Sequence, residues 1–245
     1  MNGGQRIVEL KHASFGIGGL EILKDISLQI FRGEIVVLLG ESGCGKTTTL
    51  KLINRLIDPT RGEVLVEGKA TTDWDAIELR RHIGYVLQEG GLFPHLTVGE
   101  NVGLTLKLQD ADPGRIAARV QEMLALVKLD PVKFADRYPH ELSGGQRQRV
   151  GVARALAADP DIVLLDEPFG ALDVITRTEL QKEFAAMVRD MGKTAVFVTH
   201  DLHEAQLLAA RIALMERGSI VFLGTPEEFV SSDIPLAKAY LETVT

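Results

Sequence analysis

A glycine-rich segment at residues 40–47, GESGCGKT, could hold the phosphates of a nucleotide. It fits the pattern G-x-x-x-x-G-K-[ST], with a β-branched run, EIVVLL, before it and a segment of helical spacing after it. Glycines let the backbone wrap around phosphates so that its amides point inward. Lys46 can then reach the β- and γ-phosphates, and the Thr47 hydroxyl can bind Mg²⁺. The predicted contacts in this segment are Gly40, Glu41, Ser42, Gly43, Cys44, Gly45, Lys46, Thr47 and Thr48.

The alternative for this segment is a glycine-rich turn that carries a lysine by chance. The strand and helix patterns on either side favour the phosphate loop. Cys44 is the only cysteine of the chain, so an internal disulfide is impossible. No His-Asp arrangement is evident around Cys44, and we therefore predict that it is a small filler of the loop rather than a nucleophile.

Two acids end a buried-strand pattern at residues 161–167, DIVLLDE. Asp166 at the strand tip can hold Mg²⁺ through its water shell. Glu167, one residue further, is placed to polarise a water toward the γ-phosphate. A pair of solvated acids at a strand end is the alternative, and the phosphate loop elsewhere in the chain favours the hydrolytic interpretation.

His200 closes another buried-strand pattern, AVFVTH. A histidine at the carboxyl end of a strand lies on the ligand side of an open α/β sheet, where it could reach a γ-phosphate and hold the attacking water. Two alternatives remain. His200 and His203 could form a metal site with Asp201 and Glu204, although no further ligand cluster is visible. These residues could also be the solvated start of a helix, with Asp201 near its N-cap.

Three weaker signals lie outside these segments. Gln88 follows the strand pattern HIGYVLQ, where a lone glutamine is ordinarily an edge residue. Phe15 lies on an early strand pattern, and its periodicity alone favours core packing. Residues 141–149, ELSGGQRQR, open a helix-like segment with small residues whose backbone amides can seat an anion. An ordinary helix cap is the alternative there.

The composition limits the class of protein. The chain has 245 residues, 45% of them hydrophobic, which suffices for one large domain or for a core with a smaller lobe. A net charge of -7 and an aromatic content of 5% disfavour a nucleic-acid surface. No apolar run reaches the roughly 20 residues that span a bilayer, and the N-terminus lacks a signal-peptide pattern. We therefore expect a cytosolic protein, or one held at a membrane through partners.

The order of the segments indicates the fold class. Short strand patterns occupy residues 6–39, and buried strand patterns return at DIVLLDE and KTAVFVTH. Between about 95 and 158 the patterns are helical, with Asp112-Pro113 at the entry to one helix. The alternation predicts an α/β core with a mostly parallel sheet, covered by helices, and an inserted helical lobe.

Taken together, these motifs resemble the ATPase subunit of ATP-binding cassette (ABC) transporters over essentially the whole chain. The resemblance implies an α/β fold with a P-loop NTPase (RecA-like) core, an N-terminal antiparallel β subdomain and an inserted α-helical subdomain. The motifs that carry it are, in order, GESGCGKT, Gln88, LSGGQ at 142–146, IVLLDE at 162–167, GALD at 170–173 and His200.

The resemblance also implies ATP and Mg²⁺ as cofactors and a role for each motif. Phe15 resembles the aromatic residue that stacks on adenine. Gln88 resembles the residue that links the γ-phosphate and Mg²⁺ to a transmembrane partner, and Asp173 resembles an aspartate that contacts a second copy. The implied catalytic residues are Lys46, Glu167 as the base, and His200. The implied Mg²⁺ ligands are Thr47, Gln88 and Asp166, and the residues that meet the nucleotide of a second copy are Ser143, Gly144, Gly145 and Gln146.

The implied organisation is a single ABC ATPase domain over 1–245. Its helical signature subdomain would take about 91–159, and the β subdomain and core about 1–90 and 160–245. The implied partners are a second copy in an ATP-dependent head-to-tail dimer, transmembrane permease subunits and, indirectly, a solute-binding protein. No nucleic acid is expected, and the implied location is peripheral, at the cytoplasmic face of the cell membrane.

Within the family, the runs around these motifs look most like importers of osmoprotectants such as glycine betaine, choline, carnitine or proline betaine. The chain departs from that group in three places. Many members carry a C-terminal pair of regulatory CBS modules, for which these 245 residues leave no room, so we expect no ionic-strength sensing by that route. Gly170 replaces a common serine and removes a hydroxyl. Glu41 replaces a common proline at a variable loop position.

Two alternatives stay open for the function. The cargo of an importer could instead be an amino acid, an ion or a lipid, because the ATPase subunit does not touch the solute. A soluble ABC ATPase acting on DNA or ribosomes is the other alternative. Such proteins usually have a long coiled-coil insertion or tandem cassettes, and the sequence has neither. Its acidic balance also disfavours polyanions.

Overall fold

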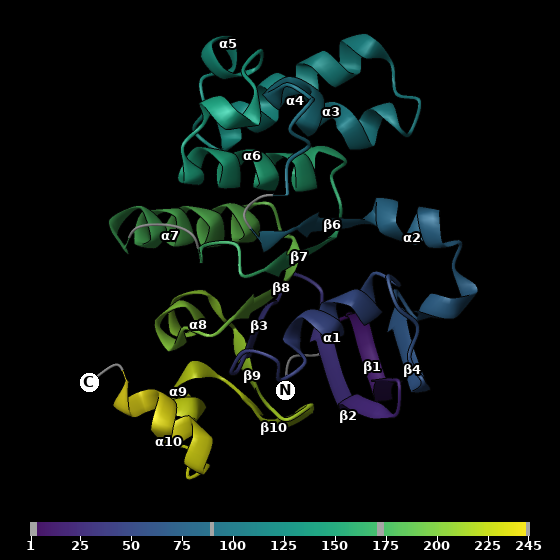
Figure 1. Cartoon of the computed structure of the whole chain (residues 1–245), viewed down its shortest axis with the longest axis vertical. Coiled ribbons are helices and arrows are strands. Elements are labelled where there is room, and N and C mark those ends of the chain that lie inside the picture. Colours follow the sequence, from purple (N-terminus) through teal and green to yellow (C-terminus); the bar gives the residue numbers. More distant parts are fainter. Residues whose placement is uncertain (1–3, 89–90, 171–173, 244–245) are drawn as a thin grey trace. The chain divides into compact units, whose positions relative to one another are not determined.

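The computed structural model describes residues 4–88, 91–170 and 174–243. The chain divides into two compact units, whose helices and strands are labelled in Figure 1. Unit 1 comprises Met1–Arg80 and Gln181–Thr245, and unit 2 comprises Arg81–Leu180. Both ends of the chain therefore contribute to unit 1, and the middle of the chain forms unit 2.

Unit 1 is built on strands from both ends of the chain. Its strands are β1 (Arg6–Ile17), β2 (Leu20–Phe31), β3 (Ile35–Leu39), β4 (Arg61–Val66), β5 (Lys69–Ala70), β8 (Thr194–Thr199), β9 (Arg211–Glu216) and β10 (Ser219–Gly224). Its helices are α1 (Lys46–Ile53), the short η1 (Thr71–Asp73), α8 (Leu202–Leu208), α9 (Pro226–Val230) and α10 (Pro235–Glu242). Two helices run across the boundary between the units, α2 (Ala76–His82) and α7 (Val174–Asp190).

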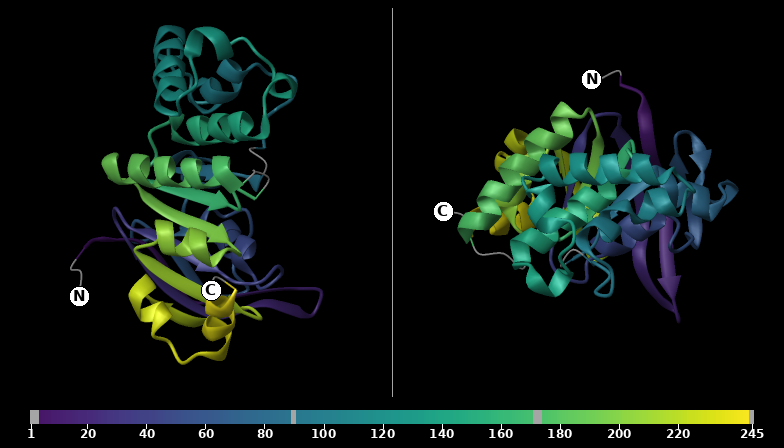
Figure 2. Two further views of the ribbon diagram at one scale, coloured as in Figure 1. Left: turned by 90° about the vertical axis from the view of Figure 1, so that its left-hand side faces the viewer. Right: turned by 90° about the horizontal axis from the view of Figure 1, so that it is seen from above.

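The N-terminal strands form an antiparallel sheet in the order β2-β1-β4-β5. β1 and β2 pair from Arg6 opposite Phe31 to Ile17 opposite Leu20, and Figure 2 shows them as a long purple ribbon. Along the second half of β2, Ile26–Ile30, buried and exposed residues alternate, as a sheet with one buried face requires. This sheet confirms the expected antiparallel β subdomain.

The remaining strands of unit 1 belong to a mostly parallel arrangement. β3 lies between β9 and β8 and runs parallel to both, and β10 pairs antiparallel with β9. All residues of β3 and β8 are buried. Continuous apolar runs of this kind are typical of parallel strands that are covered on both faces. In unit 2, β6 (Ile83–Val86) and β7 (Ile162–Asp166) are also parallel. The predicted α/β class is confirmed.

Helices make up the rest of unit 2, in the stretch where the sequence predicts them. One of them, α4, begins at the residues that the sequence indicates. Asp112 accepts hydrogen bonds from the backbone of Gly114 and Arg115 at 2.9 and 3.1 Å, with Pro113 as the first helical residue. The helices are α3 (Val98–Lys107), α4 (Pro113–Leu126), α5 (Pro131–Phe134), the short η3 (Pro139–Glu141) and α6 (Gly144–Ala157).

The helix after the glycine-rich loop is shorter than its pattern predicts. The apolar spacing runs to Leu56 and Ile57, but α1 ends at Ile53. Arg55 takes a left-handed φ of 51°, which stops the helix, and the Asn54 side chain accepts from the backbone N–H of Leu56 at 3.2 Å. The turn therefore ends the helix before the apolar pattern ends.

A buried asparagine holds the loop before α3. The side chain of Asn101 is fully buried. Its Oδ1 accepts from the backbone N–H of Phe93 at 2.8 Å, and its Nδ2 donates to the carbonyls of Phe93, Leu96 and Thr97 at 3.1, 3.2 and 2.9 Å. One buried amide thus satisfies several backbone groups of a loop that has no ladder of its own.

We expect Asn101→Asp to destabilise the protein strongly. The substitution replaces the Nδ2 donor by a carboxylate oxygen that faces three carbonyl oxygens, and we expect a loss of about 3 kcal/mol in the free energy of unfolding. Urea denaturation measures this loss. Gln109→Glu makes the same chemical change at an exposed position and should cost under about 0.5 kcal/mol. Equal stability of the two variants would contradict the role of Asn101.

Candidate nucleotide site

The glycine-rich loop between β3 and α1 is closely packed. A Cβ on Gly40 would lie 2.5 Å from the Met215 carbonyl oxygen, and a Cβ on Gly45 would lie 2.4 Å from Leu23 Cδ2. Gly45 also has a φ of 110°, which disfavours any side chain. Gly43 has a φ of 81°, with no atom near the position of its missing Cβ. The loop conformation therefore depends on glycine at several positions.

Lys46 places its ammonium group inside this loop. The side chain is buried, with 5% of its surface exposed. Its Nζ donates to the carbonyl oxygens of Gly40 and Glu41 at 2.7 and 2.8 Å. Because a buried ammonium needs acceptors, these carbonyls hold the charge at the centre of the loop. An anion that enters the loop meets this charge directly.

Cys44 behaves as the predicted filler of the loop. It is buried, and its burial raises the pKa of the thiol, an effect that the nearby Lys46 charge only partly opposes. Nucleophilic cysteines need the opposite shift, toward the thiolate. The backbone of Cys44 has a separate structural contact, because its carbonyl accepts from the N–H of Gly218 at 3.0 Å. This hydrogen bond ties the loop to the turn between β9 and β10.

The first turn of α1 follows the loop directly. Gly45 is the N-cap residue, and Lys46 begins the helix. Thr47 and Thr48 are half-buried in this first turn, and the Thr49 hydroxyl donates to the Gly45 carbonyl at 3.0 Å. The backbone amides at the start of a helix carry partial positive charge. The turn therefore adds to the attraction of the loop for anions.

His200 leaves the sheet beside the loop. Leu39 of β3 pairs with Thr199 of β8 in the parallel register, so Gly40 and His200 are the first residues beyond the same edge of the sheet. Neighbouring strands lie about 4.8 Å apart. His200 itself is exposed. The structure therefore brings together the loop and the histidine that the sequence predicts as partners.

The residues after His200 start a helix rather than a metal site. Asp201 is the N-cap of α8, and its carboxylate accepts from the His203 backbone N–H at 2.8 Å. Glu204 is buried and accepts from the side chains of Gln181 and Thr199. Among residues 4–88, 91–170 and 174–243, no three or more histidine, cysteine, aspartate or glutamate side chains form a group that could hold a metal ion.

Phe15 lies on β1, across from Leu23 of β2. Leu23 is also the residue that a Cβ added to Gly45 would approach most closely. The Phe15 side chain is half-buried, so it is not part of the fully buried core that its periodicity favours. Phe15 thus belongs to the strand pair that borders the glycine-rich loop.

In unit 2, two predicted site residues also share one sheet edge. Val86 of β6 pairs with Leu165 of β7, and Gln88 and Glu167 each lie two residues beyond this pair. Gln88 is exposed and Glu167 is half-buried. Asp166 is the last residue of β7, with 9% of its surface exposed. The acids therefore end a buried strand, as predicted.

Tyr85 contacts Asp166 and was not indicated by the sequence. Its hydroxyl donates to Asp166 Oδ2 at 3.4 Å. Burial raises the pKa of Tyr85, and the charge of Asp166 raises it further. The phenol therefore stays neutral and keeps the proton that it donates to the carboxylate. Tyr85 stands on β6, the strand paired with β7, and such a cross-strand contact leaves no motif in the sequence.

The backbone of Glu167 is strained. Its φ is 43°, in the left-handed region that residues other than glycine rarely adopt. Such conformations persist where the surrounding structure imposes them, and they concentrate at functional sites. The Glu167 carbonyl accepts from the N–H of Gly170 at 3.3 Å. A Cβ on Gly170 would lie 3.9 Å from Glu167 Oε2, so a serine would fit there and its hydroxyl would lie near the carboxylate.

The segment ELSGGQRQR forms a capped helix start. Ser143 is the N-cap of α6, where its Oγ accepts from the Gln146 N–H at 3.3 Å and Gln146 Oε1 accepts from the Ser143 N–H at 3.0 Å. Gly144 and Gly145 form the first turn and are half-buried. The geometry of this segment therefore agrees with the helix-cap interpretation. Asp173 lies outside the described residues.

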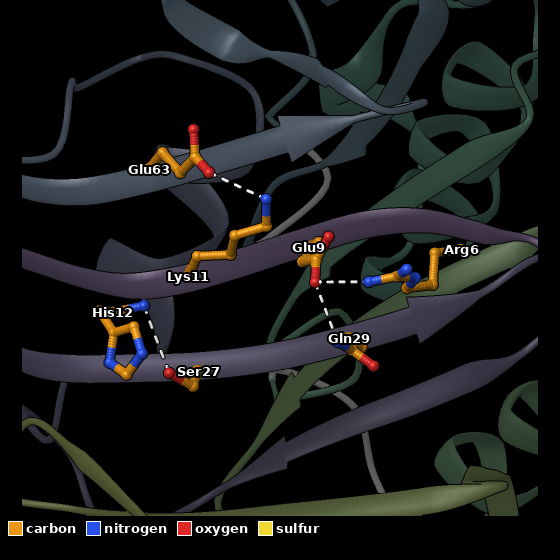
Figure 3. Close-up of polar contacts among 7 residues, drawn as sticks. All are labelled: Arg6, Glu9, Lys11, His12, Ser27, Gln29 and Glu63. Atoms are coloured by element: carbon orange, nitrogen blue, oxygen red, sulfur yellow. Dashed lines mark hydrogen bonds and ion pairs between the residues drawn. The ribbon is translucent and has the colours of Figure 1, made fainter.

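A second group of polar residues in unit 1 serves the antiparallel sheet. Figure 3 shows Lys11 and Glu63 joined at 2.9 Å, and Glu9 bound by Arg6 at 2.8 Å and by Gln29 at 2.9 Å. The Lys11–Glu63 and Gln29–Glu9 contacts link neighbouring strands, whereas Arg6 and Glu9 both lie on β1. Each charge there faces an opposite one, so the group stabilises strand pairing and does not form a second anion site.

In each unit, several predicted site residues thus lie just beyond the ends of parallel strands. Residues 23–170 match the ABC transporter family. The chain belongs to this family. In the parts of this ABC transporter chain that the structure describes, we find no helix that combines the length and the apolar character needed to cross a membrane.

Curated relatives of this ABC chain are transport ATP-binding proteins. The glycine betaine/carnitine/choline transport ATP-binding protein OpuCA of Bacillus subtilis is 52% identical over 213 residues, which are 87% of this chain and 56% of OpuCA. The choline transport ATP-binding protein OpuBA of Bacillus subtilis is 51% identical, with the same coverage of 87% and 56%. The chain therefore spans little more than half the length of these relatives.

A solved structure has the same fold. It is the ATP-binding cassette MJ0796, a dimer in a post-hydrolysis state with bound ADP and Pi. It is 37% identical to this chain, with a TM-score of 0.80, and the match covers 90% of this chain and 99% of MJ0796. The expected ABC cassette fold is thereby confirmed.

We expect Gly45→Ala to disrupt the glycine-rich loop of this ABC chain. The added methyl group meets Leu23 and forces a non-glycine residue to a φ of 110°, which together should cost about 2–4 kcal/mol of stability. Binding of a fluorescent ATP analogue should fall in parallel. Gly33→Ala is the control, because Gly33 has a φ of 77° with open space around it. It should cost about 1 kcal/mol and leave nucleotide binding unchanged. Unchanged binding by Gly45→Ala would contradict the loop assignment.

Proposed function

We propose that this chain is the ATP-hydrolysing subunit of an ABC importer that takes up a small solute. The observation that carries the proposal is the buried Lys46 ammonium, held inside a glycine-rich loop at the sheet edge where His200 also emerges. A positive charge surrounded by loop backbone at a helix start is suited to the β- and γ-phosphates of ATP.

The residues of unit 1 would bind the nucleotide. The backbone amides of residues 40–48 would contact the phosphates, and Lys46 would neutralise charge that develops on the γ-phosphate. Phe15 would stack on adenine, and its half-buried ring leaves surface for such a contact. His200 would hold the attacking water or the γ-phosphate.

The residues of unit 2 would supply the hydrolytic chemistry. Glu167 would act as the base that polarises water. Asp166, with Thr47 of unit 1 and Gln88, would hold Mg²⁺ through oxygen ligands, which this ion prefers. Bound Mg²⁺ would supply charge stabilisation at the phosphates. The Tyr85 hydroxyl donates to Asp166 and would orient its carboxylate. Gln88 is exposed just after β6, where it could also contact a partner and couple it to the nucleotide site.

A second copy of the chain would complete each site. Ser143, Gly144, Gly145 and Gln146 would meet the γ-phosphate of a nucleotide bound by the other copy. The cap at Ser143 uses the hydroxyl oxygen as an acceptor, so its hydrogen can be donated to a phosphate. The dimeric state of MJ0796 supports this assembly. Asp173 would contact the other copy near the same interface.

The partners follow from this assembly. Permease subunits in the membrane would contact the Gln88 region and the helical signature subdomain, about 91–159, which we propose as one part of a single ABC ATPase domain. The chain would act at the cytoplasmic face of the membrane, where ATP is available. A solute-binding protein would deliver the cargo, and no role for nucleic acid is proposed.

The cargo is proposed from the relatives. OpuCA and OpuBA are named for transport of glycine betaine, carnitine and choline. A quaternary amine is therefore our first candidate for this chain. The ATPase subunit does not touch the solute, and an amino acid, an ion or a lipid remains the second candidate.

We expect Glu167→Gln to separate ATP binding from hydrolysis. The amide keeps the shape of the side chain and cannot accept a proton from water, so turnover should fall by about 10²-fold or more while ATP affinity stays within about threefold. ATP should then accumulate in a dimer. Phosphate release measures turnover, and light scattering with and without ATP measures the dimer.

The control for this experiment is Glu227→Gln, the same change at an exposed position on α9, which should hydrolyse ATP normally. If Glu167→Gln remains monomeric at saturating ATP, the head-to-tail assembly is wrong. If it hydrolyses ATP at the normal rate, Glu167 is not the base.

The test of the cargo uses the solute-binding protein of the proposed importer. Isothermal titration with glycine betaine, choline and carnitine should show binding of at least one, since aromatic residues attract quaternary ammonium groups through cation–π interactions. Binding of an amino acid or an anion instead, with none of these amines, would overturn the osmoprotectant proposal and leave the ATPase proposal intact.

A further inference from the structure

Unit 1 contains a buried carboxylate four residues after His200 in the sequence. Glu204 of α8 is 5% exposed. Its Oε1 accepts from Gln181 Nε2 at 2.7 Å, and its Oε2 accepts from the Thr199 hydroxyl. Gln181 and Thr199 are each 2% exposed, so all three polar side chains are removed from water. Such groups are costly to bury unless they are hydrogen-bonded to one another, and here they are.

The Thr199 hydroxyl links this carboxylate to the backbone around His200. Thr199 is the last residue of β8, and its Oγ donates to Glu204 while accepting from the Asp201 N–H at 3.0 Å. The hydroxyl has one hydrogen, which it donates to Glu204 in a hydrogen bond. The lone pairs of the same oxygen therefore face the Asp201 amide. Glu204 therefore fixes where the Thr199 hydroxyl points, and with it the position of the oxygen that accepts from the Asp201 N–H.

His200 is thus held on both sides while its own side chain remains exposed. Before it, Thr199 is fixed by the β3 pairing and by Glu204. After it, the Asp201 backbone is bound to Thr199, and its carboxylate caps α8 by accepting from His203. His200 belongs to no helix or strand. The hydrogen bonds of its two neighbours nevertheless leave the turn that carries it little freedom to reorient.

We propose that Glu204, acting through the Thr199 hydroxyl, is a positioning residue that fixes His200 for ATP hydrolysis. Gln181 of α7 orients the Glu204 carboxylate for this purpose. The inference rests on the proposed role of His200 in hydrolysis. It assigns a function to buried residues that lie outside the glycine-rich loop.

The test uses Thr199→Val in the full chain. Valine keeps the shape of the side chain and removes the hydroxyl, so the hydrogen bond to the Asp201 amide is lost. We expect kcat for ATP hydrolysis to fall by about tenfold to a hundredfold, because small misplacements of a catalytic group have effects of this size. KM for ATP and binding of a fluorescent ATP analogue should change less than about twofold. Thr199→Ser restores the hydroxyl and should recover most of kcat.

A spectroscopic readout reports on His200 directly. In protein labelled with ¹³C-histidine, the His200 imidazole signal is assigned by its loss in His200→Ala. It should shift or broaden in Thr199→Val and in Glu204→Gln, and should return in Thr199→Ser. Thr72→Val removes an exposed hydroxyl and should leave kcat and this signal unchanged. If Thr199→Val does not fold, Glu204→Gln answers the same question.

The outcomes separate this inference from the proposed function. Normal kcat and an unchanged His200 signal in folded Thr199→Val and Glu204→Gln would overturn the positioning role and leave the role of His200 standing. If Thr199→Val lowers the residual activity of His200→Ala as much as it lowers that of the wild type, the threonine acts elsewhere, and the inference fails. Normal hydrolysis by His200→Ala would refute the proposed role of His200 itself.

Discussion

β3 and β8 are buried on both faces along their whole length, so neither strand can present a polar side chain to a ligand before it ends. In parallel register their carboxyl ends coincide, and the first residues beyond them, Gly40 and His200, are set side by side. β6 and β7 obey the same constraint in unit 2, where Gln88 and Glu167 emerge together. These four residues therefore lie where buried parallel strands end.

The chain must also turn sharply after these strands end, and these turns require unusual backbone φ angles. Gly45 combines a φ of 110° with close contact to Leu23, and only glycine fits there. At Glu167 a φ of 43° is imposed on a residue with a full side chain. Glycine would relieve this strain but would remove the carboxylate. Strain is thus retained at Glu167, whose carboxylate the proposed hydrolysis requires, and is avoided at Gly45.

The sequence predicts the elements whose signals are local. Continuous β-branched runs predicted β3, β7 and β8, and the Asp112-Pro113 pair predicted the start of α4. The sequence did not predict where α1 ends, because the left-handed Arg55 interrupts an apolar pattern that continues. It did not indicate Tyr85 beside Asp166, or Gln181 and Thr199 beside Glu204. The Tyr85–Asp166 and Gln181–Glu204 contacts join distant parts of the chain. All three contacts are single hydrogen bonds, which have neither a period nor a motif.

The segment ELSGGQRQR shows why a local signal can support two interpretations at once. A cap and an anion seat both need a small polar residue before a helix, and the Ser143 capping box satisfies the first requirement within the chain. The cap uses the serine oxygen as an acceptor, whereas a phosphate would need its hydrogen. The first use leaves the hydroxyl hydrogen available for the second. A well-formed cap is therefore no argument against an anion seat, and only a nucleotide brought by another molecule can distinguish them.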